Sequence, residues 1–229
     1  IRECSQVAQK YMGGAMLSGA IGVAPKKITI VGSGVVGKSA AKTAKAIGAD
    51  VSVLDIDFDA LKKVSEELGV KTYFASESNL YELLKDTDFL ICAVKENPFE
   101  IPVITADMVA KMKKGRLIID AGITSGNTVV ETLDTVTTLS NPICEKEGML
   151  YFSAPDLASL AANAISGVVS GILTRYIIPV VSNKDMIYAM MDCKELVSGV
   201  MTYNGKITNE KVAEIFNEEV YELSMLTGI

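Results

Sequence analysis

Residues 28–37 read Ile-Thr-Ile-Val-Gly-Ser-Gly-Val-Val-Gly, and the predicted fold follows from this stretch. The apolar run 28–31 is rich in β-branched residues, which is typical of a buried parallel strand. It ends in a Gly-x-Gly-x-x-Gly turn, and residues 38–48 then have the composition of a helix closed by a glycine. A strand, a glycine turn and a helix in this order predict a binding site for a dinucleotide.

Each glycine of the turn has its own task in such a site. Gly32 makes the tight turn, Gly34 lets a pyrophosphate approach the backbone because it lacks a Cβ, and Gly37 lets the helix pack close to the strand. The helix N-terminus adds free N–H donors and the positive end of a dipole. The alternative interpretation is a glycine turn that holds no ligand.

A second predicted strand, 51–54, ends at Asp55. This acid follows the glycine turn at about the 20-residue distance at which dinucleotide-binding domains place a carboxylate for the ribose 2′-hydroxyl. A carboxylate there would repel a 2′-phosphate, so Asp55 favours NAD over NADP as the cofactor. Without a ligand, Asp55 would serve only as a cap at the end of its strand.

The composition narrows the possible functions. The 229 residues carry a net charge of −6 without a basic stripe, so no nucleic-acid partner is expected. The four cysteines form no CxxC pair, which indicates reduced thiols of a cytoplasmic protein and no metal site. Histidine, the commonest general acid–base residue, is absent. The sequence opens at Ile1 without a signal-peptide pattern, and we expect it to begin inside a longer polypeptide.

Strands and helices alternate through the first half of the chain. An amphipathic helix is predicted over 3–17, with Val7, Tyr11 and Met12 on one face. Further strands are predicted at 70–74, 89–94 and 117–120, and further helices at 57–68, 78–85 and 105–112. This alternation predicts an α/β fold, a Rossmann-type, doubly wound, mostly parallel sheet with flanking helices.

The pattern changes after residue 120. Short strands are predicted at 135–139 and 149–152, and residues 157–174 form an apolar stretch without charge. That stretch reaches the roughly 18 residues at which a membrane span becomes conceivable. Its small residues, and the charges of Asp156 and Arg175 at its ends, favour a central buried helix instead, so no membrane insertion is expected. The tail 183–229 is predicted to form short helices around a turn at 203–206.

Several of these stretches resemble the C-terminal half of the alanine dehydrogenase and proton-translocating transhydrogenase family. The resemblance covers nearly the whole chain in order. Its most particular element is the Thr-Tyr-x-Gly-Lys-x-Thr pattern at 202–208, and residues 22–37, 48–57 and 112–120 also carry it. It implies a dinucleotide-binding domain at 25–182. Residues 1–24 would connect to a preceding substrate domain, and 183–229 would return to it.

The resemblance also implies which residues contact NAD. The pyrophosphate loop corresponds to Gly32, Ser33, Gly34, Val35, Val36 and Gly37, and the ribose carboxylate to Asp55. At the adenine end lie Ile56 and the hydroxyl of Ser76, and at the nicotinamide end Val94, Thr124, Asp156 and Leu157. Family members are dimers or hexamers, so a homo-oligomer is expected, with the small-molecule substrate held by the preceding domain.

One position departs from the family. Alanine dehydrogenases carry a catalytic Asp where this chain has Thr124, and a hydroxyl can donate a hydrogen bond but cannot act as a carboxylate base. No catalytic residue is therefore assigned here; such residues are expected in the preceding region. The remaining candidates, Glu96, Glu100 and Asp120, are expected to be solvated loop charges, and Cys92 a core residue.

Three functions remain open at this point. The first is the NAD(H)-binding portion of an oxidoreductase resembling alanine dehydrogenase. It would position nicotinamide for hydride transfer to or from an amino-acid or 2-oxo-acid type of substrate. The second is a soluble transhydrogenase-type subunit that passes hydride to a second nucleotide. The third is a non-catalytic NAD-sensing domain.

Overall fold

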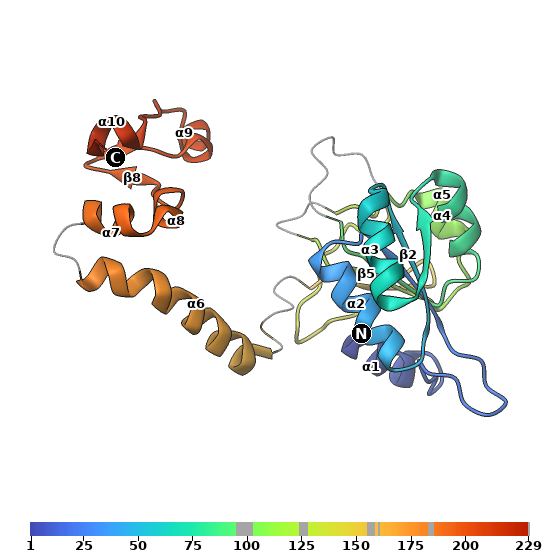
Figure 1. Cartoon of the computed structure of the whole chain (residues 1–229). Helices are drawn as coiled ribbons and strands as arrows, with labels where there is room; N and C mark the ends of the chain where they lie inside the picture. The colour runs from blue at the N-terminus through green and yellow to red at the C-terminus, as the bar shows by residue number, and fades with distance from the viewer. Residues whose placement is uncertain (95–102, 124–127, 155–158, 160, 183–185, 229) are drawn as a thin grey trace. The chain divides into compact units, whose positions relative to one another are not determined.

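The computed structural model describes residues 1–94, 103–123, 128–154, 159, 161–182 and 186–228 (Figure 1). The chain forms two compact units, Ile1–Leu157 and Ala158–Ile229, and each is described by itself.

The first unit is built on a seven-stranded sheet in the order β3-β2-β1-β4-β5-β7-β6. Neighbouring strands are parallel except for β6, which pairs antiparallel with β7 at the edge. The strands are β1 Lys27–Val31, β2 Asp50–Asp55, β3 Lys71–Phe74, β4 Phe89–Cys92, β5 Leu117–Asp120, β6 Cys144–Lys146 and β7 Met149–Phe152. The predicted Rossmann-type sheet is confirmed, and the strand order reverses between β1 and β4, where such sheets bind ligands.

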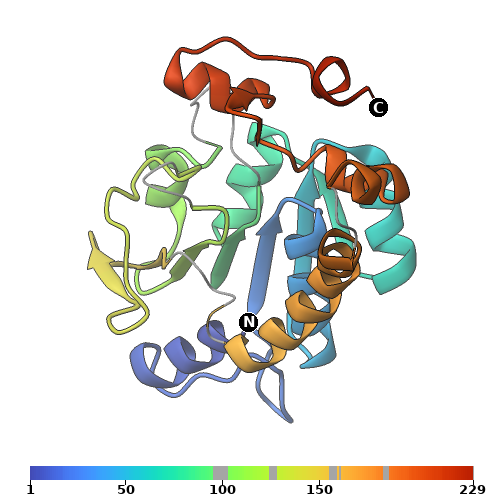
Figure 2. The ribbon, with the colours of Figure 1, turned by 90° about the vertical axis from the view of Figure 1, so that its left-hand side faces the viewer.

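Helices cover both faces of this sheet (Figure 2). Apolar residues of α1, α2 and α3 pack on one face, and those of α4 and α5 on the other. Successive side chains of a strand point to opposite faces of the sheet. Ile28 and Ile30 of β1 therefore pack with α1, α2 and α3, whereas Val31 packs with α4 and α5. The helices are α1 Arg2–Tyr11, α2 Val35–Ala46, α3 Phe58–Leu68, α4 Glu77–Leu84 and α5 Ala106–Lys111.

The ends of α3 and α4 follow from capping residues in the sequence. The Asp57 carboxylate accepts hydrogen bonds from the backbone N–H groups of Asp59 and Ala60, which fixes the first turn of α3. Gly69, at a φ of 56°, ends the helix in the left-handed conformation. The Ser76 hydroxyl caps α4 by accepting from the N–H of Asn79 at 3.3 Å.

Two local predictions in the first unit are wrong. Helix α1 ends at Tyr11, because Gly13 and Gly14 adopt φ values of 67° and 77°; its buried residues are Cys4, Val7 and Ala8, while Tyr11 is exposed. No strand forms over 135–139. There the hydroxyl of Ser153 accepts from the Thr137 N–H and donates to the Thr135 carbonyl, so a side chain takes the place of a strand ladder.

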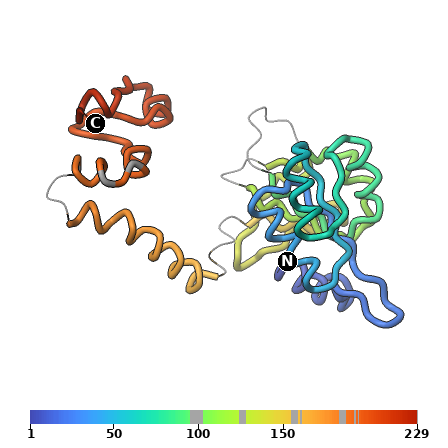
Figure 3. Tube along the Cα trace, viewed as in Figure 1, coloured from blue at the N-terminus to red at the C-terminus, as the bar shows by residue number. Residues whose placement is uncertain are grey.

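The second unit begins with a long apolar helix, α6 Ala162–Ser182 (Figure 3). It continues past Arg175, and none of its residues is buried among the described residues, whereas a central buried helix was predicted. The other described elements of this unit are short, so they cannot bury a helix of 21 residues along its length. By length and composition α6 could cross a membrane, a test that core helices of soluble proteins also pass.

The rest of the second unit consists of short elements, as predicted for the tail. Asn204 and Gly205, both with positive φ, join β8 and β9 in a two-residue hairpin turn. The elements are α7 Met186–Asp192, α8 Lys194–Val197, β8 Thr202–Tyr203, β9 Lys206–Ile207, α9 Glu210–Phe216 and α10 Leu223–Thr227.

Candidate functional site

The glycine turn lies at the carboxyl end of β1, between the ends of β2 and β4. Gly32 has a φ of 99°, and its N–H donates to the Leu54 carbonyl at 2.8 Å. A Cβ at this position would lie 2.5 Å from the Ala93 carbonyl oxygen, in a conformation that side chains rarely adopt. Gly32 is therefore required by the protein's own backbone.

The other two glycines of the motif differ sharply in their surroundings. A Cβ on Gly37 would lie 1.8 Å from the Gly32 carbonyl oxygen, because α2 packs directly against the turn. A Cβ on Gly34 would meet no atom within 4 Å. The packing of the described residues explains Gly32 and Gly37, but it does not explain Gly34, which borders open space at the start of α2.

Helix α2 opens at Gly34 without a side-chain cap among the described residues. The helix therefore begins with N–H groups that no side chain satisfies, next to the open space over Gly34. The side chains of Val35 and Val36 in this first turn are exposed. Such a helix start suits an anion, because its N–H groups donate and its dipole is positive there.

Asp55 at the end of β2 is tied to the glycine turn. Its Oδ2 accepts hydrogen bonds from both the backbone N–H and the hydroxyl of Ser33 at 2.5 Å, and its Oδ1 accepts from the N–H of Asp57 at 3.0 Å. Partial burial raises the pKa of Asp55, but hydrogen bonds from Ser33, Asp57 and Ile56 outweigh it and lower the pKa below its ordinary value. The group is thus a carboxylate at neutral pH and keeps lone pairs for further donors.

The structure brings Val94 to the same edge of the sheet. An added Cβ on Gly32 would lie 3.2 Å from the Val94 N, and one on Gly122 would lie 2.4 Å from the Val94 carbonyl oxygen. Val94 therefore sits between the turns that follow β1 and β5. The exposed Ile56 follows Asp55 directly, and Ser76 lies beyond the end of β3, where its hydroxyl already serves as a helix cap.

The remaining predicted contacts, Thr124, Asp156 and Leu157, lie outside the described residues, as do Glu96 and Glu100.

Asp120 is a correction to the sequence prediction. It is 1% exposed at the end of β5, whereas a solvated loop charge was predicted. Its carboxylate accepts from the Gly122 N–H at 3.0 Å, the Thr128 hydroxyl at 2.6 Å and the Val129 N–H at 3.3 Å. Asp120 therefore ties the end of β5 to Gly122, Thr128 and Val129, a role without a sequence signal because two of these partners lie 8 and 9 residues away.

Cys92 is a core residue, as predicted. It is fully buried at the end of β4. Burial first, and the nearby Asp120 second, raise the pKa of its thiol well above the ordinary value. The thiol is therefore not ionised at neutral pH and is a poor nucleophile.

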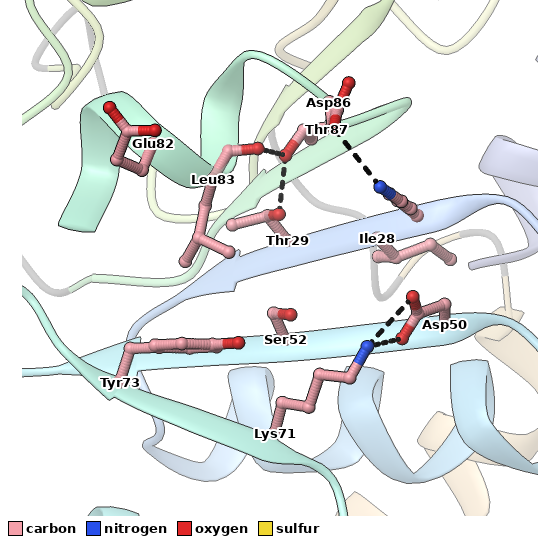
Figure 4. A pocket seen from close by; sticks show the side chains of 11 residues that line it. Ile28, Thr29, Asp50, Ser52, Lys71, Tyr73, Glu82, Leu83, Asp86 and Thr87 are labelled. Atoms are coloured by element: carbon pink, nitrogen blue, oxygen red, sulfur yellow. Dashed lines mark hydrogen bonds and ion pairs between the residues drawn. The ribbon is translucent and has the colours of Figure 1, made fainter.

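A pocket of about 200 Å³ lies near the opposite, amino ends of the strands (Figure 4). The Lys71 ammonium contacts both oxygens of Asp50 at 2.8 and 3.1 Å, and the Lys27 ammonium lies 3.4 Å from Asp86. The hydroxyls of Thr29 and Thr87 bond to each other at 2.6 Å. Because these charges face each other, this pocket offers less to an anionic ligand than the carboxyl edge does.

The family model described as alanine dehydrogenase/PNT, C-terminal domain, matches residues 2–210 of the chain. The alanine dehydrogenase of Bacillus subtilis is 34% identical over 214 residues, which are 91% of this chain and 56% of that protein. The alanine dehydrogenase of Methanococcus maripaludis is 31% identical over 215 residues, covering 92% of this chain and 57% of that protein. The chain thus spans somewhat more than half the length of these relatives.

Solved structures of known proteins share the fold. An L-alanine dehydrogenase superposes with a TM-score of 0.85 at 23% identity, covering 95% of this chain and 60% of that one. A transhydrogenase from Sinorhizobium meliloti superposes with a TM-score of 0.70 at 23% identity, covering 90% of this chain and 57% of that one.

Proposed function

The chain belongs to the alanine dehydrogenase/PNT C-terminal domain family, which binds NAD, and we propose that it is the cofactor-holding portion of an NAD-dependent amino-acid dehydrogenase. In this proposal the chain positions nicotinamide for hydride transfer to or from an amino-acid or 2-oxo-acid type of substrate. A preceding region of the whole protein would hold that substrate.

The observation that carries this proposal is the open space over Gly34. The neighbouring glycines are explained by clashes within the protein, and Gly34 is explained by a ligand that must approach the backbone there. The uncapped start of α2 supplies donors for a pyrophosphate, and the ionised Asp55 supplies an acceptor for the ribose hydroxyls. The residues present therefore fit NAD.

When bound, NAD would supply the hydride chemistry, and the chain's residues would bind and orient it. Residues 33–37 would hold the pyrophosphate, Asp55 the adenosine ribose, and Ile56 and Ser76 the adenine end. Val94 would line the nicotinamide side, together with Thr124, Asp156 and Leu157. Holding the ring in one orientation turns hydride transfer into a step between positioned partners, which lowers its entropic cost.

A second candidate is hydride transfer to another nucleotide, as in a transhydrogenase. Thr124 favours it, because this residue lacks the carboxylate that alanine dehydrogenases carry at the position. Asp120 does not replace that carboxylate, since it is buried and already accepts three hydrogen bonds. An assay of the whole protein separates the two. Reduction of NAD by L-alanine supports the dehydrogenase, and exchange between two nucleotides with partner subunits supports the transhydrogenase.

We further propose that the whole protein is a cytoplasmic homo-oligomer in which α6 is covered by protein. Family membership supports the oligomer, and the small residues of α6 and the charge of Arg175 within it support a protein environment. Analytical ultracentrifugation of the whole protein tests this: an oligomer in the absence of detergent is expected, and a requirement for detergent would contradict it.

The cofactor proposal is tested by titrating NADH and NADPH with the chain. The fluorescence of the reduced nicotinamide ring, excited outside the absorption band of protein side chains, gives the signal for both nucleotides. We expect NADH to bind more tightly than NADPH. In Asp55→Ala we expect the affinity for NADH to fall about tenfold or more, since a hydrogen bond to a charged group is lost. The preference for NADH over NADPH should disappear. Glu66→Gln, an exposed acid near the far end of α3, is the matched control. Equal binding of both nucleotides by the unaltered chain would contradict the role of Asp55.

A further inference from the structure

The rings of two solvent-exposed phenylalanines stack on each other close in sequence to Asp55, the residue proposed to bind the ribose. The rings of Phe58 and Phe74 have centroids 4.9 Å apart and planes 11° from parallel. Yet Phe58 is 69% exposed and Phe74 is 39% exposed, and the neighbouring Ile56 is 74% exposed. We call Ile56, Phe58 and Phe74 the aromatic shelf. Large apolar surface left in water next to a binding edge indicates a ligand or partner.

The shelf is fixed in place by the backbone around Asp55. In the β2–β3 register, Asp55 is the direct partner of Phe74, and the Ala75 N–H donates to the Asp55 carbonyl at 2.9 Å. The side chain of Asn79 donates to the Phe74 carbonyl at 2.8 Å. Phe58 is the first residue of α3, held there by the Asp57 cap. The backbone therefore places both phenylalanines next to Asp55, the residue that would hold the ribose.

The charges around the shelf restrict what it can take. Asp55, Asp57 and Asp59 lie on the same short stretch as Ile56 and Phe58, so an anionic group such as a phosphate is disfavoured there. A neutral, flat ring is compatible with these carboxylates. Adenine is such a ring, and it is bonded directly to the ribose that Asp55 would bind.

We propose that the aromatic shelf is the platform for the adenine ring of NAD, an inference that rests on the proposed function. The exposed face of the Phe58–Phe74 stack accepts the base, and Ile56 covers its edge. Stacking of a base on an aromatic side chain strengthens binding by roughly 5- to 150-fold, and a partly solvated platform belongs to the lower end of that range. The shelf thereby anchors the adenosine end independently of the nicotinamide.

The test is calorimetric titration of NADH, ADP-ribose and nicotinamide mononucleotide with Phe58→Ala and Phe74→Ala. We expect the affinity for NADH and for ADP-ribose to fall about fivefold or more in each variant. The affinity for nicotinamide mononucleotide, which lacks adenine, should stay unchanged. Phe216→Ala is the matched control, because Phe216 is 68% exposed on α9 of the other unit. Phe58→Tyr should retain the affinity, since it keeps the stacked ring.

The outcomes separate this inference from the proposed function. If the unaltered chain binds NADH and the two alanine variants bind it equally well, the shelf is not the adenine platform, while the NAD proposal stands. An equal loss of affinity for nicotinamide mononucleotide would also overturn the shelf, because the effect would then be a general distortion. If the unaltered chain binds no NADH or ADP-ribose, both proposals fail.

Discussion

The two edges of the parallel sheet in the first unit use the same residue types in opposite ways. At the amino edge, Lys71 faces Asp50 (Figure 4), and the Lys27 ammonium lies 3.4 Å from Asp86, so that these charges are neutralised within the protein. At the carboxyl edge, Asp55 is held by Ser33 without a cationic partner among the described residues, and the first turn of α2 has no side-chain cap. The carboxyl edge therefore keeps groups that the fold orients but that the described residues leave partly unsatisfied, which is what a bound ligand would need.

The largest expected effect comes from Gly37→Ala, which breaks the carboxyl edge itself. The new Cβ would lie 1.8 Å from the Gly32 carbonyl, so α2 must move away from the turn. We expect the free energy of unfolding to fall by about 3 kcal/mol, the upper part of the usual cost of overpacking. Urea denaturation followed by circular dichroism measures it. An unchanged denaturation midpoint would show that α2 does not need this close contact.

Gly34→Ala separates binding from folding at the same turn. The new methyl group meets no protein atom within 4 Å, and the φ of −64° suits alanine. We expect stability to stay the same or to rise by about 0.5 kcal/mol. We expect NADH affinity to fall about tenfold, because the pyrophosphate can no longer approach the backbone. Parallel denaturation and NADH titration test both, and full NADH affinity would remove the main support for the ligand at this position.

Ser33→Ala tests how the fold orients Asp55. The variant loses the hydroxyl bond to Oδ2 but keeps the backbone one, so we expect NADH affinity to fall about threefold to tenfold. The pKa of Asp55 should rise toward the ordinary 3.8.

The pH dependence of stability follows from the sign of that shift. A lowered pKa stabilises the folded chain above pH 3.8, and this contribution is lost as the pH falls through the lowered pKa. The stability difference between the unaltered chain and Ser33→Ala should therefore shrink in acid. An NMR titration of the Asp55 carboxyl carbon measures the pKa, and an identical value in the variant would contradict the role of Ser33.

The smallest effect is expected at the amino edge. In Lys71→Ala the exposed ion pair with Asp50 is lost, and such pairs contribute less than about 1 kcal/mol. NADH affinity should not change, because the pair lies at the opposite end of β2 and β3. A clear loss of NADH binding in Lys71→Ala would mean that the two edges are not independent. Lys62→Ala, on the exposed side of α3, is a matched lysine control.

The elements of the first unit were largely predictable because their signals are local. The β-branched run before Gly32, the Asp57 cap and the Gly69 stop each act within a few residues, and the structure confirms the elements they define. The failures have long-range causes. Ser153 bonds to the backbone of Thr135 and Thr137, where a strand was predicted, and β6, which was not predicted, pairs with the edge of β7. The burial of a helix such as α6 likewise depends on what surrounds it, which its composition does not specify.

Near-neighbour residues alone specify that a strand, a glycine turn and a helix begin this chain's nucleotide-binding fold, and that an acid ends the second strand. Chain stiffness, capping and the period of apolar residues act between residues that are close in sequence, so the amino-acid sequence alone reveals them. Only the tertiary structure decided that Ser33 holds Asp55, that Asp120 is buried among donors, and that Phe74 stacks on Phe58. Strand register and helix packing bring Ser33 to Asp55 and Phe58 to Phe74, and the donors to Asp120 come from up to 9 residues further along the chain.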